Sequence, residues 1–127
     1  NGTSMLITSM FDKEMAENNV TLLDEVCHRH QVIWLQLPII DDEAPSKIFE
    51  SRWVKLKPII LDELKYKGVV AVHCKGGTGR TGTVIALILL ALGWPINKIV
   101  TEVQSVKPNA LRIKKQLDYL HSQVTKS

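Results

Sequence analysis

The segment HCKGGTGRT, residues 73 to 81, places a cysteine and an arginine six positions apart around a glycine-rich bend. Glycines adopt positive φ without steric cost, so successive backbone N–H groups of such a bend can point inward and surround an anion. The apolar run from Thr83 to Leu92 favours a buried helix, whose partly positive N-terminus would add to this attraction. Arg80 brings a planar guanidinium that can donate to two phosphate oxygens. The segment therefore predicts a phosphate-binding loop between a strand and a helix.

Cys74 is the candidate nucleophile of this loop. A cysteine attacks phosphorus only as a thiolate, and a free thiol is mostly protonated at neutral pH. Inward N–H groups, the helix N-terminus, Arg80 and the Thr81 hydroxyl can all stabilise negative charge on the sulfur. An inert buried thiol is the alternative for a lone cysteine, but the surrounding loop favours the reactive form.

The rest of the chain alternates between two hydrophobic patterns. Apolar runs of strand-like length, rich in Val and Ile, are Met5 to Met10, Val32 to Ile40 and Val69 to His73. Segments with apolar residues at helical intervals cover residues 22–30, 53–64, 95–106 and 111–124. Strands alternating with helices predict an α/β fold with a central, mainly parallel sheet flanked by helices.

Length, charge and cysteine content limit the class of protein. With 127 residues, 45% of them hydrophobic, the chain suits one domain spanning residues 1–127. A net charge of +3 is too small to indicate a nucleic-acid partner, and the apolar runs are too short to cross a bilayer. Cys27 and Cys74 are far apart in a chain large enough to fold without disulfides. We expect a cytoplasmic monomer that binds neither nucleic acid nor membrane.

His-Cys, five further residues and Arg-Thr form a pattern that resembles the signature loop of the protein tyrosine phosphatase superfamily. The segments PIIDDEAP, residues 38–45, and IKKQLDYLH, residues 113–121, look similar to its compact dual-specificity branch. The resemblance implies the cysteine-phosphatase fold, a phosphoprotein substrate and no cofactor. Members usually carry one or two more strands ahead of the first strand here, so we expect this domain to lack an N-terminal strand or two.

The same resemblance assigns roles within the loop. Cys74 would be the nucleophile, and Arg80 would hold the phosphoryl group. Thr81 would stabilise the sulfur as it leaves, while His73 would orient the loop. Besides Arg80, the residues expected to bind phosphate, mainly through backbone N–H groups, are Lys75, Gly76, Gly77, Thr78 and Gly79.

The leaving oxygen of a phosphorylated side chain needs a proton, so a carboxylic acid should face the loop. Asp41 and Asp42 follow a predicted strand, where a parallel sheet gathers functional groups. Members of the family carry an aspartate four residues before a proline, and Asp41 stands at this spacing from Pro45. We therefore assign the acid to Asp41 and treat Asp42 as a solvated neighbour, the alternative being a purely solvated acidic turn. By resemblance, Gln116 would position the hydrolytic water, or else lie on an exposed helix face.

Cys27, His28 and His30 do not predict a metal site, because residues two apart on a helix point to nearly opposite faces. We expect no metal. Cys27 is expected to pack among apolar neighbours, and a redox role beside Cys74 is the alternative.

The leading hypothesis is a dual-specificity protein phosphatase that forms a phosphocysteine intermediate. A phosphoinositide phosphatase is a second possibility, because lipid-specific relatives share the His-Cys-Lys start of the loop. They usually carry a lysine where this chain has Thr78. A non-catalytic pseudophosphatase that binds phosphoproteins is the third, although both Cys74 and Arg80 are present.

Overall fold

Three parallel strands form the central sheet of the computed structural model, which describes residues 2–76 and 79–124. They are β1 (Met5–Thr8), β2 (Ile33–Gln36) and β3 (Val70–His73), in the spatial order β2-β1-β3. Thr8 is in register with Gln36 on one side and with His73 on the other. All three carboxyl ends are therefore level, and the predicted α/β fold with a parallel sheet is confirmed.

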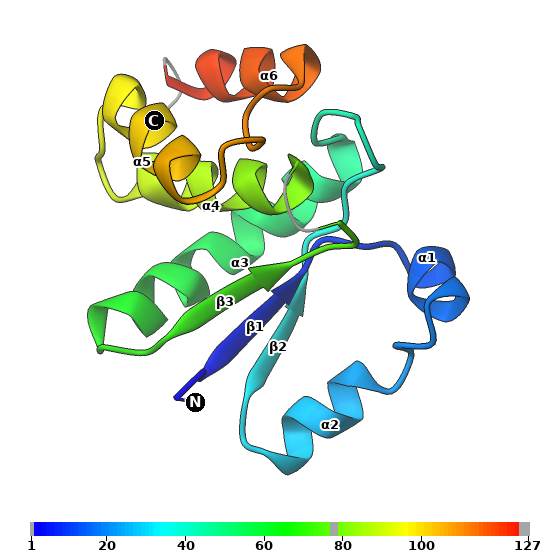
Figure 1. Ribbon diagram of the computed structural model, residues 1–127. Helices are drawn as coiled ribbons and strands as arrows, with labels where there is room; N and C mark the ends of the chain where they lie inside the picture. The colour runs from blue at the N-terminus through cyan, green and yellow to red at the C-terminus, as the bar shows by residue number, and fades with distance from the viewer. Residues whose placement is uncertain (1, 77–78, 125–127) are drawn as a thin grey trace.

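Six helices of the described chain surround this sheet. Their bounds are α1 (Asp12–Glu17), α2 (Leu23–Arg29), α3 (Lys47–Lys65), α4 (Gly79–Ala91), α5 (Ile96–Val106) and α6 (Lys114–Val124). Figure 1 shows α3 behind the sheet, α1 and α2 on the side of β2, and α4 carrying α5 and α6 on its far side.

The core lies between one face of the sheet and helices α3 and α4. Met5 and Ile7 of β1 are fully buried there, together with Phe49 and Ile60 of α3. Helix α4 is buried on almost all sides, as its uniform apolar sequence predicts, and Val84 is completely enclosed. This packing fixes the start of α4 against the sheet. No helix in the described ranges is long and apolar enough to span a membrane.

The observed elements differ from the predicted ones mainly at their ends. Helix α1 was not predicted, because its 6 residues are too few to show a helical period. Helix α3 begins at Lys47 rather than near Trp53 and continues through Pro58. Helix α6 begins at Lys114 because Leu111 has a φ of 58°, a left-handed conformation that a helix cannot include.

Gly82 in the first turns of α4 allows a close approach that a larger residue would prevent. A Cβ atom at this position would lie 2.8 Å from the Cβ of Ala110. Overpacking of this kind costs about 1–3 kcal/mol, whereas alanine is favoured over glycine in a helix by about 1 kcal/mol.

We therefore expect Gly82→Ala to lower the free energy of unfolding by about 1 kcal/mol, measured by urea denaturation. Ala110→Gly in the same chain removes the opposing methyl group and should restore part of the loss. A single variant as stable as the parent protein would show that the neighbouring turn simply moves away.

Candidate active site

The segment between β3 and α4 brings Cys74 and Thr81 together. Cys74 follows the last residue of β3, and its Sγ accepts a hydrogen bond of 3.1 Å from Thr81 Oγ1 in the first turn of α4. Gly76 has a φ of +86°, which glycine adopts without strain. Gly77 and Thr78, also predicted to bind phosphate, lie outside the described residues. The thiol thus lies at the N-terminal end of a helix, beside a hydroxyl donor.

Arg80 is only 1% exposed and carries the most extensive polar contacts of the site. Its Nη1 and Nη2 atoms donate to the two carboxylate oxygens of Glu14 in α1, the second at 2.8 Å. It also donates to the backbone carbonyls of Ile39 and Lys75. Its Nε has no hydrogen-bond partner in the described parts of the chain. One edge of the guanidinium is therefore fixed, while Nε–H remains available as a donor.

Glu14, the carboxylate partner of Arg80, was not predicted from the sequence. The hydrogen bonds from Arg80 hold the pKa of the Glu14 carboxyl below its usual range, and the charges of Arg80 and Lys75 act in the same direction. The one sequence feature that points to Glu14 is its place shortly after β1, because functional groups gather where the strands of a parallel sheet end.

Asp41 lies in a turn beyond β2 and approaches the same guanidinium. Its Oδ1 is 3.7 Å from Arg80 Nε, and its side chain is 72% exposed. Asp42 has a φ of 63°, a left-handed conformation that aspartate tolerates, and the turn closes with a hydrogen bond from Glu43 N–H to the Ile40 carbonyl. Of the two aspartates, the structure brings Asp41 to Arg80.

His73 ends β3 and is oriented by two side chains on neighbouring strands. Its Nε2 lies 2.7 Å from Thr8 Oγ1, which also accepts a hydrogen bond of 2.8 Å from Trp34 Nε1. The indole can only donate, so the Thr8 hydroxyl proton is left available to His73. Burial lowers the pKa of His73, which favours its neutral form.

Gln116 is completely buried rather than exposed on α6. Its Nε2 donates to the backbone carbonyl of Glu43 at 2.9 Å, and its Oε1 has no hydrogen-bond partner among the described residues. A Cβ atom built on Gly79 would lie 3.3 Å from this oxygen. Gln116 therefore contacts both the Asp41 turn and the start of α4.

A hollow of about 470 Å³ lies between α1 and the Asp41 turn. Lys75, which is exposed, forms part of its wall. The other lining residues are Phe11, Lys13, Glu14, Glu17, Asn18, Ile40 and Asp41. Acidic and basic groups both face this space, so it does not select a strongly charged ligand by charge alone.

Cys27 lies at the opposite end of the sheet from Cys74. Its carbonyl accepts a hydrogen bond from Val32 N–H, just before β2, whereas Cys74 follows the carboxyl end of β3. Cys27 lies level with the start of the strands and Cys74 level with their end. A strand of four residues is about 13 Å long, so the two cysteines are too far apart for a disulfide. The alternative of Cys27 as a redox partner of Cys74 is therefore not supported. Burial raises the pKa of the Cys27 thiol, with a smaller effect from Asp24.

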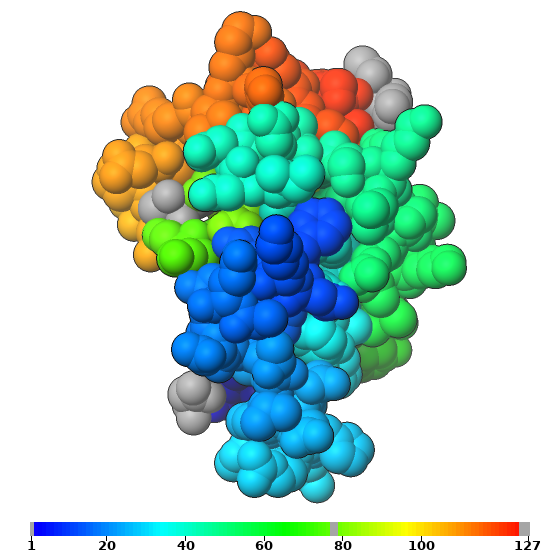
Figure 2. Space-filling view, turned by 90° about the vertical axis from the view of Figure 1, so that its right-hand side faces the viewer, coloured from blue at the N-terminus to red at the C-terminus, as the bar shows by residue number. Residues whose placement is uncertain are grey.

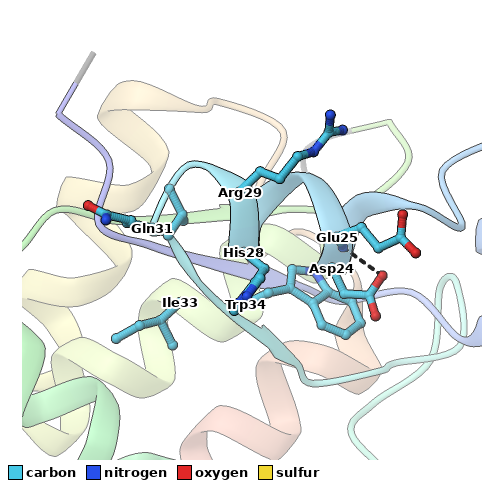
Figure 3. A pocket seen from close by; sticks show the side chains of 8 residues that line it. Asp24, Glu25, His28, Arg29, Gln31, Ile33 and Trp34 are labelled. Carbon is cyan, nitrogen blue, oxygen red and sulfur yellow. Dashed lines mark hydrogen bonds between the residues drawn. The ribbon is translucent and has the colours of Figure 1, made fainter.

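A second hollow, of about 810 Å³, is found beside α2 and the start of β2. Figure 3 shows Asp24, Glu25, His28 and Arg29 of α2 around it, with Trp34 of β2. It contains none of the predicted functional residues. Within the described ranges, no three His, Cys, Asp or Glu side chains gather closely enough to hold a metal ion.

Replacing Glu14 by glutamine should destabilise the protein by about 1–3 kcal/mol at neutral pH, because Arg80 would remain buried with weaker partners. The pKa of Glu14 is lowered in the folded state. The stability that ionised Glu14 adds is therefore fully present above the unfolded pKa of about 4.3, and it is lost as pH falls through the pKa of the folded state. Urea denaturation of both proteins at neutral and acidic pH should therefore show a difference that shrinks in acid. Glu17→Gln, an exposed change on the same helix, is the control. If the loss in the free energy of unfolding were independent of pH, or equal to that of the control, the ion pair would be contradicted.

Several known phosphatases resemble this chain. It is 32% identical over 72 residues to a probable protein tyrosine phosphatase type IVA B of Dictyostelium discoideum, covering 56% of this chain and 44% of that protein. It is 26% identical over 113 residues to the tyrosine-protein phosphatase CDC14 homolog of Schizosaccharomyces pombe, covering 88% of this chain and 18% of that one. A phosphatidylinositol 3,4,5-trisphosphate 3-phosphatase, ptn1, of the same yeast is 41% identical over 56 residues, 41% of this chain and 16% of that one. The chain thus spans less than half the length of these relatives.

Solved structures show the same fold. Kinase associated phosphatase, in a form whose catalytic cysteine is replaced by serine, superposes with a TM-score of 0.86 at 22% identity, over 98% of this chain and 70% of that one. Tk-PTP in its active form gives a TM-score of 0.79 at 23% identity, over 99% of this chain and 81% of that one. Residues 2–127 match the family described as PTP-SAK, Swiss Army Knife protein, DSP-PTPase phosphatase domain, and the chain belongs to this family.

Proposed function

We propose that the chain is a dual-specificity protein phosphatase that hydrolyses phosphoserine, phosphothreonine or phosphotyrosine through a phosphocysteine intermediate on Cys74. The observation that carries this proposal is the convergence of three groups: the Cys74 thiol bonded to Thr81, the buried Arg80 with a free Nε–H, and the carboxyl of Asp41. They would serve as a nucleophile, a hydrogen-bond donor to the phosphate anion and a proton donor within one site.

In the first step the Cys74 thiolate attacks phosphorus, and the bond from phosphorus to the substrate oxygen breaks. Asp41 gives its proton to that oxygen, which leaves as a neutral hydroxyl. Arg80 Nε–H would donate to one equatorial oxygen, while its Nη atoms stay bonded to Glu14; donation to two phosphate oxygens, as the sequence predicts, would require an Nη atom to leave its present partner. The backbone N–H groups of residues 75–79 would surround the same oxygens, those of Gly77 and Thr78 lying outside the described residues.

In the second step water attacks the phosphocysteine. The Asp41 carboxylate takes a proton from the water, and the sulfur leaves as a thiolate stabilised by the Thr81 hydroxyl. Gln116 Oε1, which faces Gly79, is the group we propose to position this water. His73 would orient the loop from its bond with Thr8.

A phosphoinositide phosphatase is the second candidate, favoured by Lys75 in the wall of the 470 Å³ hollow and by the likeness to ptn1. The acidic groups Glu17 and Asp41 line the same hollow beside Lys13 and Lys75, so its charge gives no preference for the further phosphates of an inositol ring. Assays with phosphothreonine and phosphotyrosine peptides and with phosphoinositide vesicles separate the candidates. Turnover of lipid without turnover of peptide would replace the protein phosphatase with the lipid enzyme.

We further propose that the enzyme acts as a monomer, since the groups assigned to catalysis all come from one chain. A reducing, cytoplasmic compartment suits its two free thiols, because attack by Cys74 requires an unoxidised sulfur.

Cys74→Ser should abolish hydrolysis while binding of phosphate survives, because the serine hydroxyl is not ionised at neutral pH and the surrounding donors remain. We expect less than about 1% of the parent turnover, with phosphopeptide binding retained in a titration. If the variant still turns over well above this level, the covalent route is excluded. Binding by a parent protein that shows no turnover would instead identify a pseudophosphatase.

Asp41→Asn should reduce kcat at least about a hundredfold on a phosphothreonine peptide, whose leaving oxygen is strongly basic. The loss should be much smaller on an activated aryl phosphate, which needs little proton donation, and the pH profile should lose the limb that reports this acid. Asp42→Asn is the matched control in the same turn. The assignment to Asp41 fails if Asp42→Asn shows this dependence on the leaving group instead.

A further inference from the structure

Within the described residues, two side chains of helix α6 bond to Glu43, a residue of the turn that carries Asp41. Lys115 Nζ lies 3.0 and 3.1 Å from the two carboxylate oxygens of Glu43. The next residue along the helix, Gln116, donates to the Glu43 backbone carbonyl at 2.9 Å. Figure 2 shows the segment around residue 43 between α1 below and α6 above. Two adjacent side chains of α6 thus hold the backbone and the side chain of one residue.

Glu43 and Asp41 belong to the same tight turn. The Glu43 N–H donates to the Ile40 carbonyl at 2.9 Å and closes a tight turn around the two aspartates. Asp42 takes the left-handed conformation in this turn, at φ 63°. The backbone on either side of Asp41 is therefore closed into one hydrogen-bonded turn, which Glu43 completes.

Asp41 itself has little to hold it in place. Its side chain is 72% exposed, and its contact with Arg80 Nε spans 3.7 Å, longer than a hydrogen bond. The adjacent lysines of α6 differ in their partners: Lys114 pairs with Asp118 on the same helix, whereas Lys115 reaches across to Glu43. Lys115 is therefore the lysine of this pair that connects the helix to the turn.

We propose that Lys115 and Glu43 are positioning residues, whose ion pair holds the Asp41 turn over Arg80 in the orientation needed for proton transfer. This inference rests on the proposed phosphatase function and on Asp41 as its acid. The pair is exposed on both sides, at 63% for Lys115 and 46% for Glu43. Exposed ion pairs shift a conformational equilibrium by up to about fivefold and are weakened by salt.

Lys115→Met tests the proposal, with Lys114→Met as the matched control. We expect kcat on a phosphothreonine peptide to fall about two- to fivefold for Lys115→Met, and to fall less on an activated aryl phosphate. Lys114→Met removes an exposed lysine from the same helix turn and should leave both rates unchanged. Raising the salt concentration should reduce the difference between parent and Lys115→Met.

A double-mutant cycle tests whether the two residues act as a pair. Glu43→Gln should reproduce the effect of Lys115→Met, and the double variant should show no further decrease. Amide hydrogen exchange over residues 38–46 gives a readout independent of turnover, and should be faster in Lys115→Met than in Lys114→Met.

Equal behaviour of the two lysine variants, in peptide turnover and in exchange, would overturn the inference while leaving the phosphatase function intact. Equal losses on peptide and aryl phosphate would also overturn it, because they would indicate a general structural effect. A parent protein inactive on both substrates would refute the proposed function instead, and faster exchange confined to Lys115→Met would then establish the attachment of the turn without its catalytic role.

Discussion

The site depends on the buried ion pair between Arg80 and Glu14. A guanidinium that is 1% exposed needs a partner with matching geometry, and the two oxygens of Glu14 provide it. The pair joins α4 to α1, and the segment of chain between these two helices contains β2 and β3. It also decides which edge of Arg80 remains available, because both Nη atoms are engaged while Nε has no hydrogen-bond partner among the described residues. Binding of phosphate can therefore use a donor that is already oriented.

The parallel sheet explains why these groups meet. With Thr8, Gln36 and His73 in register, the segments that leave all three strands begin at the same level. Glu14 follows β1, Asp41 follows β2 and Cys74 follows β3, although they are separated by up to 60 positions in the chain. Helix α4, enclosed on nearly every side, holds Thr81 within hydrogen-bonding distance of Cys74 at this edge. The fold thus converts three distant segments into one site.

The sequence was most informative where several local requirements coincide. The segment of residues 73–81 combines glycines, a strand and an apolar helix, so the end of β3 and the start of α4 could be predicted, whereas phosphate as its ligand stays a prediction. The Asp41 assignment rested on spacing to Pro45 and stays a prediction; what the structure adds is that the Asp41 carboxylate lies 3.7 Å from Arg80 Nε. Glu14 could not be found, because its partner is distant in sequence and a helix of 6 residues shows no period. Gln116 was placed on α6, but its complete burial depends on tertiary contacts with Glu43 and Gly79.

Two carboxylates approach the same guanidinium, and their environments suit them to different tasks. Glu14 makes two charge-assisted hydrogen bonds to Arg80, which lower its pKa and keep it ionised. A carboxylate held in this way is poorly suited to donate a proton, because protonating one of its oxygens would remove an ionic hydrogen bond to Arg80. Asp41 approaches only Nε, at 3.7 Å, and is largely open to solvent and to a leaving group. The separation of a fixed, ionised carboxylate from an accessible one is what distinguishes an anchor for the arginine from a candidate acid. Glu14 is fixed by its two hydrogen bonds to Arg80, whereas Asp41 has no contact of that kind in the described chain, so in our proposal the attachment of its turn to α6 supplies the order that these bonds give to Glu14.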